Sequence, residues 1–188
     1  MKIVSGIARN LDLQTPDTLG VRPTAIRSRK ALFDSLGSLE GAAVTDLFAG
    51  SGALGLESAS RGASQVTFVE LERSHCRCIE ENIAAVRRTG VTADLKLICG
   101  SALAVELWGA SAGDVIFADP PYAASAELFL QLTGSALFQK AAAGRELVWE
   151  IPDLPGSAGA FLRPAALSEY TLRKFGGTLF LIGKVREN

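Results

Sequence analysis

Cysteine is scarce in this 188-residue chain, which has three, Cys76, Cys78 and Cys99. An odd, sparse set of thiols does not form the disulfide framework of a small secreted domain, and it fits a reducing compartment. Long apolar runs are lacking too, and none approaches the roughly 20 residues that a membrane-spanning helix needs. The opening residues contain no apolar segment of the kind found in signal peptides. We therefore expect a cytoplasmic protein that does not enter a membrane.

The chain also lacks a strong excess of one charge. Its 19 basic and 20 acidic residues give a net charge of −1, which by itself argues against a general nucleic-acid binder. The distribution is uneven, however, because residues 1–30 hold six basic and two acidic groups. A basic N-terminal segment on an acidic body is either a phosphate-binding surface or a solvated helix face. Charge alone does not decide between these two interpretations.

Hydrophobic residues are plentiful, at 48% of the chain, and suffice for the core of one domain. From residue 43 onward, nearly all-apolar segments alternate with helical patterns, which predicts a parallel sheet covered by helices on both faces. The predicted strands are residues 43–50, 65–70, 93–100, 114–119 and 145–152. The predicted helices are residues 53–62, 73–90 and 126–142, with a short helix that includes Trp108.

The two ends of the chain depart from this alternation. Residues 167–175 and 178–185 predict an antiparallel hairpin around Gly176-Gly177. Residues 2–6 and 11–15 predict another short hairpin, followed by a helix capped near Thr24.

The whole pattern is the outline of a class I methyltransferase, a Rossmann-like, doubly wound and mostly parallel α/β sheet that closes with an antiparallel hairpin. We expect a basic N-terminal extension in residues 1–40 and the methyltransferase domain in residues 41–188. Residues 152–165 are expected to form a loop of unspecified structure.

A glycine-rich turn follows the first strand of the alternating region. Gly50-Ser51-Gly52-Ala53-Leu54-Gly55 is a full G-x-G-x-x-G pattern between a strand and a helix. Its glycines allow a tight turn and the close approach of a ligand to the backbone. Glu70 ends the second predicted strand, where its carboxylate can accept both hydroxyls of an adenosine ribose.

These features fit a nicotinamide dinucleotide as well as S-adenosylmethionine. A dehydrogenase, however, needs a substrate domain or further catalytic groups, and the single histidine, His75, is expected on the surface of a helix. Asp46, in the first strand of the alternating region, would attract the positive end of the methyl donor, directly or through water, and would repel a pyrophosphate. The methyl donor is favoured, and an NAD-dependent oxidoreductase remains the alternative from another class.

The segment Asp119-Pro120-Pro121-Tyr122 follows the fourth of these strands. Two prolines cannot extend a strand ladder because both lack an N–H, so a stiff turn is the minimal interpretation. The chemistry of amine methylation suggests more, because the lone pair of an exocyclic amine is delocalised into its base. The Asp119 carboxylate and the Pro120 carbonyl can accept the amine hydrogens, Pro121 stiffens the turn, and Tyr122 can stack on a flipped base.

Two further patterns leave alternatives open. Ser101 and Ala102 follow the third strand, where they can lie near an adenine, although a helix N-cap at Ser101 explains that residue equally well. His75, Cys76 and Cys78 suggest a metal site, but helical positions two apart point about 200° from each other. We expect no metal, with Cys76 and Cys78 as core or surface thiols and Cys99 in the core.

The segments DLFAGSGALGLES, ADPPY and RPTAIRSRKALF together resemble the RsmD family, which methylates the exocyclic N2 amine of one guanine in bacterial small-subunit (16S) ribosomal RNA. The resemblance covers essentially the whole chain. It implies that S-adenosylmethionine is the methyl donor and S-adenosylhomocysteine the product, without a metal. The RNA partner is either naked or part of an incompletely assembled 30S particle, and we expect a monomer.

Site residues follow from these interpretations. The expected catalytic residues are Asp119, Pro120, Pro121 and Tyr122. The expected cofactor residues are Asp46, Ala49, Gly50, Gly52, Glu70, Leu71, Ser101, Ala102 and Asp119. The expected RNA-binding residues are Arg9, Arg22, Thr24, Arg27, Arg29 and Lys30.

Other amino-methyltransferases remain as alternatives. An enzyme acting on adenine N6 or cytosine N4, in DNA or in another RNA, shares the Asp-Pro-Pro-Tyr pattern. Such DNA enzymes usually carry a separate target-recognition region, for which this chain has no obvious room.

Overall fold

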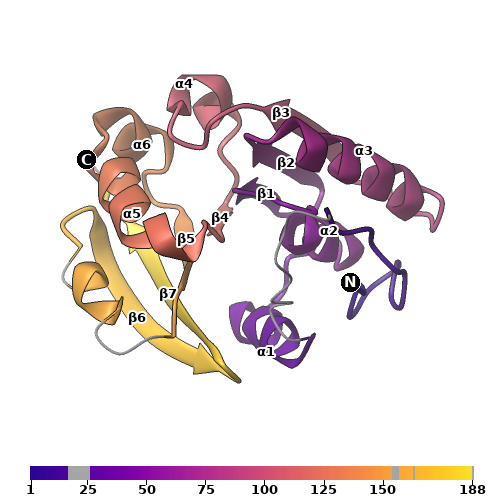
Figure 1. Ribbon diagram of the computed structural model, residues 1–188, viewed down its shortest axis with the longest axis horizontal. Coiled ribbons are helices and arrows are strands. Elements are labelled where there is room, and N and C mark those ends of the chain that lie inside the picture. Colours follow the sequence, from indigo (N-terminus) through magenta and orange to yellow (C-terminus); the bar gives the residue numbers. More distant parts are fainter. Residues whose placement is uncertain (17–25, 154–156, 163, 188) are drawn as a thin grey trace.

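The computed structural model describes residues 1–16, 26–153, 157–162 and 164–187 of the chain. It confirms the predicted α/β fold, in which helices cover both faces of one sheet (Figure 1). Among the described residues, no helix combines the length and the apolar character needed to cross a membrane.

The sheet has seven strands within the described residues, and they are β1 (Ala43–Leu47), β2 (Gln65–Glu70), β3 (Asp94–Cys99), β4 (Val115–Ala118), β5 (Glu146–Ile151), β6 (Leu167–Phe175) and β7 (Thr178–Val185). They lie in the order β3-β2-β1-β4-β5-β7-β6. The first five strands pair in parallel, whereas β7 is antiparallel to both β5 and β6. The pair of β6 and β7 is the predicted hairpin. The strand order reverses between β1 and β4, and open α/β sheets bind ligands in the crevice at such a reversal.

Helices connect the strands at the positions that the sequence pattern predicts. Their bounds are α1 (Ile26–Leu36), α2 (Ala53–Ser60), α3 (Arg73–Arg87), α4 (Val105–Trp108), α5 (Ser125–Gly134) and α6 (Ala136–Ala141). Short 3₁₀ helices are η1 (Gly109–Ser111), η2 (Tyr122–Ala124) and η3 (Ser157–Phe161).

Each face of the sheet has its own core. On one face, α1, α2 and α3 pack on a core that contains Phe33, Phe68 and Phe117, and the rings of Phe33 and Phe117 lie 5.4 Å apart. On the other face, α4, α5 and α6 surround Trp108 and Trp149. Apolar side chains therefore point to both sides of the strands, which explains why the strands in the sequence are almost continuously apolar.

Two predicted elements differ in detail. The helix expected at residues 126–142 is two helices, because the Ser135 hydroxyl accepts a hydrogen bond from the Phe138 N–H at 3.4 Å and starts α6. The N-terminal hairpin has one antiparallel bridge, between Lys2 and Asp12. The helix cap expected at Thr24 lies outside the described residues.

The N-terminal hairpin is joined to the body of the fold by Glu57 of α2. Its buried carboxylate accepts hydrogen bonds from the backbone N–H groups of Val4 at 2.6 Å and Ser5 at 3.0 Å. It also pairs with Arg61 at 2.8 Å and lies 3.9 Å from the guanidinium of Arg29. We call these residues the Glu57 network; they connect the hairpin, α1 and α2 around the buried charges of Glu57 and Arg29.

Two of the three cysteines, Cys76 and Cys99, differ from the prediction. Cys76 and Cys99 form a disulfide, with Cα atoms 6.2 Å apart. Cys99 is exposed rather than in the core, because it ends β3 at the edge of the sheet. Cys78 is buried, and its thiol donates to the Gln14 carbonyl at 3.3 Å. The two helical cysteines thus have different partners, as expected for positions two apart on a helix.

Candidate active site

The glycine turn, the strand-end acid Glu70 and the Asp-Pro-Pro-Tyr segment line one cavity beside the reversal in strand order. Its volume is about 680 Å³, a size suited to a nucleoside-sized ligand. The lining residues used below are Phe48, Gly50, Glu70, Leu71, His75, Ser101, Ala102, Asp119, Pro120, Pro121, Tyr122 and Glu150. The structure therefore brings the predicted catalytic and cofactor segments together.

The turn after β1 has an unusual backbone. Phe48, a non-glycine residue, has a φ of 58°, and Gly50 and Gly52 have φ values of 57° and 76°. A bulky residue at positive φ stores strain, and such strain concentrates at functional sites. Gly55 packs so closely on β2 that a Cβ atom would lie 2.3 Å from the ring of Phe68. The last glycine of the motif thus serves helix packing, while Gly50 faces the cavity.

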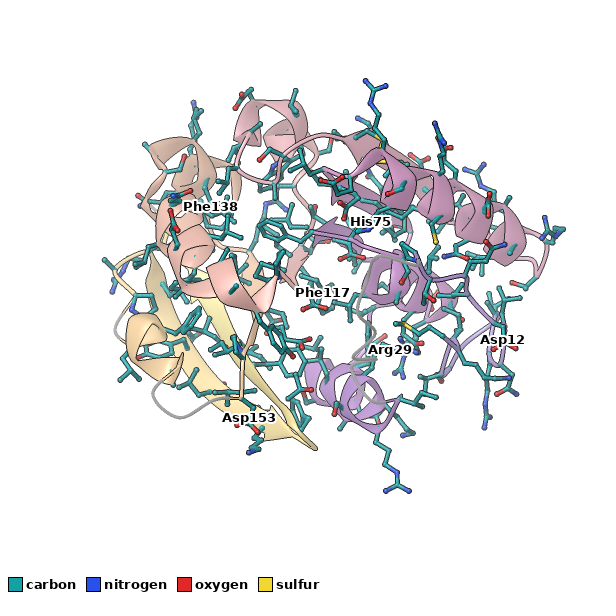
Figure 2. All side chains as sticks on the ribbon, viewed as in Figure 1. Asp12, Arg29, His75, Phe117, Phe138 and Asp153 are labelled. Atoms are coloured by element: carbon teal, nitrogen blue, oxygen red, sulfur yellow. A yellow bond between two sulfur atoms is a disulfide. The ribbon has the colours of Figure 1, made fainter. Side chains whose placement is uncertain are left out.

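Glu70 fixes the turn as well as facing the cavity. One carboxylate oxygen accepts the Gly50 N–H at 2.7 Å, and the other accepts the Glu72 N–H at 2.8 Å. His75 lies 3.5 Å from the same carboxylate and lines the cavity, so the expectation of a surface histidine is wrong. Figure 2 shows His75 on α3 beside the centre of the molecule. The helical pattern of the sequence cannot reveal this contact between His75 and Glu70. It depends on the position of the carboxyl end of β2 next to the first turn of α3.

Asp46 lies beneath the glycine turn rather than on the cavity wall. Its side chain is 1% exposed and accepts the Gly55 N–H at 2.8 Å. Burial raises the pKa of Asp46 to about 8, and the charge of Glu70 adds to the shift, although the hydrogen bond from Gly55 opposes it. Asp46 therefore supports the turn, as do Ala49 and Gly52, which the sequence also assigns to the cofactor but which do not line the cavity.

Asp119 directly follows β4 and lies near two other carboxyl groups. Burial raises its pKa well above the usual range, and the charges of Glu150 and Asp46 raise it further. We call Asp46, Asp119 and Glu150 the carboxyl cluster. Carboxyl groups whose charges interact titrate as a set, so the cluster is suited to a positively charged ligand or to a group that gives up a proton.

Tyr122 is held in the cavity through its hydroxyl group. The hydroxyl donates a hydrogen bond to Oε1 of Glu150 at 2.8 Å. The Ser125 hydroxyl donates to the Glu150 carbonyl at 3.3 Å and accepts from Nε1 of Trp149 at 3.0 Å. Sequence reasoning missed Glu150, although an acid near the end of an apolar strand, like Glu70 on β2, is a visible signal.

Three of the predicted cofactor residues, of which Ser101 and Ala102 were expected near the adenine, lie on the opposite side of the glycine turn from β5. Leu71 is 65% exposed and, with Ser101 and Ala102, lines the cavity. Ser101 accepts the Leu103 N–H through its hydroxyl at 3.2 Å, whereas the residue that caps α4 is Ala104. The hydroxyl therefore stabilises the turn after β3, and the simple helix-cap explanation does not hold.

The predicted RNA-binding residues do not share one environment. Arg9, Arg27 and Lys30 are exposed, and Lys30 forms an ion pair with Asp34 at 2.5 Å. Arg29 is 1% exposed, so the expectation that it contacts RNA needs correction (Figure 2). Its guanidinium donates to the Lys2 carbonyl, and burial lowers its pKa despite the nearby Glu57. The predicted residues outside the described part of the chain are Arg22 and Thr24.

A sheet with this strand order, a glycine-rich turn and a closing antiparallel strand defines the class I methyltransferase fold. A family model described as "Conserved hypothetical protein 95" matches residues 1–178. The chain belongs to this family, the RsmD family, which confirms the resemblance found in the sequence.

Individual relatives agree with this assignment. "Ribosomal RNA small subunit methyltransferase D" of Escherichia coli K12 is 32% identical over 123 residues, which span 65% of this chain and 60% of that protein. Among solved structures, a putative methyltransferase of Escherichia coli is 26% identical, with a TM-score of 0.78 and coverage of 100% of this chain and 99% of that chain. A hypothetical protein of Thermus thermophilus is 33% identical, with a TM-score of 0.70 and coverage of 98% and 99%.

Proposed function

We propose that this protein transfers a methyl group from S-adenosylmethionine to the exocyclic N2 amine of a guanine in small-subunit ribosomal RNA. The observation that carries the proposal is the cavity shared by Gly50, Glu70 and the segment from Asp119 to Tyr122. It combines a strand-end acid suited to a ribose with two acceptors suited to an amine. The name of the Escherichia coli relative supports ribosomal RNA as the substrate.

The residues of the cavity fit S-adenosylmethionine. Glu70 would accept the ribose hydroxyls, while Leu71, Ser101 and Ala102 would surround the adenine. The carboxyl cluster would attract the positive sulfonium, because a nearby cation favours the charged form of buried acids. When bound, the cofactor supplies an electrophilic methyl group.

The catalytic residues would act on the amine. The Asp119 carboxylate and the Pro120 carbonyl would accept its two hydrogens and so orient the nitrogen lone pair toward the methyl group. Methylation leaves the nitrogen with one proton to lose, and Asp119, whose pKa is raised by burial, is a suitable acceptor. Most of the rate enhancement would come from this alignment.

The proposal is tested by incubating the protein with methyl-labelled S-adenosylmethionine and 30S subunits from an Escherichia coli strain without its own small subunit methyltransferase D. We expect N2-methylguanosine in nucleosides digested from the RNA and separated by mass spectrometry. N6-methyladenosine or N4-methylcytidine instead would favour the other amino-methyltransferases. Binding of NAD without binding of S-adenosylmethionine would favour the oxidoreductase.

The exposed cations of α1 are proposed to contact RNA phosphates. Replacing Arg27 and Lys30 together by alanine should weaken RNA binding and lower the slope of log affinity against log salt by about 1 to 2, because fewer counterions are released. Cofactor affinity should not change. Filter binding at several salt concentrations measures the RNA affinity and its salt slope.

A matched variant is expected to change the RNA affinity in the opposite direction. Asp34→Asn removes the ion-pair partner of Lys30 and should strengthen RNA binding. If neither variant changes the affinity or its salt slope, this surface is only solvated.

A further inference from the structure

We propose that Glu150 determines the specificity of the target pocket by accepting a hydrogen bond from the N1–H of guanine. The inference rests on the proposed function, in which Asp119 and the Pro120 carbonyl hold the neighbouring N2 amine. Glu150 would thus contribute the third acceptor in a row that matches the Watson–Crick edge of one base.

The sheet brings Glu150 beside Asp119. The last paired residues of β4 and β5 are Ala118 and Trp149. Asp119 directly follows β4, and Glu150 is the next residue of β5. Phe117 and Val148, two residues earlier on each, belong to the core on the α1–α3 face. Because side chains alternate along a strand, Asp119 and Glu150 both point to that same face. Both line the cavity.

The surroundings of Glu150 hold its side chain in place. It is 3% exposed, and its carboxylate accepts the Tyr122 hydroxyl at 2.8 Å. Its backbone carbonyl is fixed by Ser125 at 3.3 Å. A buried carboxyl group carries a large desolvation cost, so an acid at a cavity wall beside another acid is a recognised mark of a functional site.

The chemistry of the bases explains what an acceptor at this place selects. Guanine presents the N1–H donor beside its amine, whereas adenine and cytosine present an acceptor, N1 or N3, beside theirs. A carboxylate next to Asp119 therefore pairs with guanine and repels the other two. Flipped bases are recognised through hydrogen bonds to this edge. Specificity can come from repulsion of the wrong base as well as from attraction of the right one.

The test uses the RNA fragment found methylated in the function assay, synthesised with guanine or with 2-aminopurine at the target position. 2-Aminopurine keeps the amine at C2 but has an acceptor at N1 in place of the N1–H. For the unmodified protein we expect kcat/KM to be about 10- to 100-fold higher for guanine, within the range of discrimination that one base-specific hydrogen-bond pair provides. Equal kcat/KM values for the two RNAs would overturn the inference. This test needs only the unmodified protein.

The variant Glu150→Gln keeps the shape and an acceptor for Tyr122 but adds an N–H donor. We expect the preference for guanine to fall at least tenfold, chiefly through KM, while the melting temperature is retained and the cofactor affinity falls by less than the preference does. Tyr122→Phe is the matched control, because it removes the hydroxyl and leaves the Glu150 carboxylate, so it should keep the preference even if turnover falls.

The possible failures are distinguishable. An unchanged preference in folded Glu150→Gln, with N2-methylguanosine still formed, would show that Glu150 only positions Tyr122. Absence of methyl transfer by the unmodified protein to any RNA would overturn the proposed function together with this inference.

Discussion

Replacing Asp119 by asparagine is expected to lower kcat for methyl transfer by about 10²-fold or more, the usual cost of losing one fixed transition-state partner. Asparagine keeps the shape and one acceptor oxygen, but it adds a competing donor and cannot take the proton that the amine releases. Asp119 lies in the carboxyl cluster, where its charge is already disfavoured by burial. The fold should therefore be retained, with an unchanged or higher melting temperature. Single-turnover methylation beside thermal melts measures both effects.

Two controls separate catalysis from stiffness of the turn. Asp119→Ala should lose as much activity as Asp119→Asn, since neither keeps a carboxylate beside Pro120. S-adenosylmethionine affinity, measured by calorimetry, should fall far less than kcat in both, because Glu70, Ser101 and Ala102 still line the cofactor side of the cavity. Full activity of folded Asp119→Asn would leave Asp119-Pro120-Pro121 as a rigid turn only.

Replacing Glu57 by alanine is expected to cost about 3–5 kcal/mol of folding free energy, the range for breaking a buried ion pair by removing one partner. Glu57 is fully buried and receives two backbone hydrogen bonds from the N-terminal hairpin. Nε of Arg29 has no hydrogen-bond partner within the described part of the chain, so Glu57 at 3.9 Å compensates its charge. The alanine variant would leave that guanidinium buried without compensation. Urea denaturation at neutral pH measures the loss.

Glu57→Gln is the matched variant, because it keeps the shape and one acceptor oxygen, for Val4 or Ser5, while it removes the charge and the second acceptor. We expect an intermediate loss. Adding Arg29→Met to Glu57→Gln should recover part of the stability, since the uncompensated charge is then gone. A loss below about 1 kcal/mol for Glu57→Ala would mean that this carboxylate contributes no more than a typical intramolecular hydrogen bond.

Much of the fold was predictable because the spacing of apolar residues and the positions of turn residues indicate the same helices and strands. The apolar strands, the glycine-rich turn and the hairpin at Gly176-Gly177 are local patterns, and the structure has all three. Parallel strands meet at one edge, so the convergence of Glu70 and Asp119 on one cavity also follows from the pattern. The break at Ser135 depends on one side-chain hydrogen bond and was not predicted.

The remaining site residues depend on packing that the sequence does not reveal. Arg29 belongs to a basic segment, yet the orientation of α1 directs it inward toward Lys2 and Glu57. Asp46 lies one residue before the last residue of β1, and its side chain therefore lies beneath the glycine turn instead of on the cavity wall. The position of Glu150 beside Asp119 follows only from the pairing of β4 with β5, which the sequence does not show.

The position of β7 inside the sheet also bears on how the protein avoids aggregation. An outer strand exposes unpaired backbone groups that can pair with another molecule, and charged side chains on it oppose such pairing. The outer strands here are β3 and β6, which expose Lys96 on one side and Glu169, Arg173 and Lys174 on the other. Because β7 inserts between β5 and β6, its apolar sequence is paired along both sides. A hairpin docked in the reverse order would leave this apolar strand as the border of the sheet, open to pairing with a second molecule.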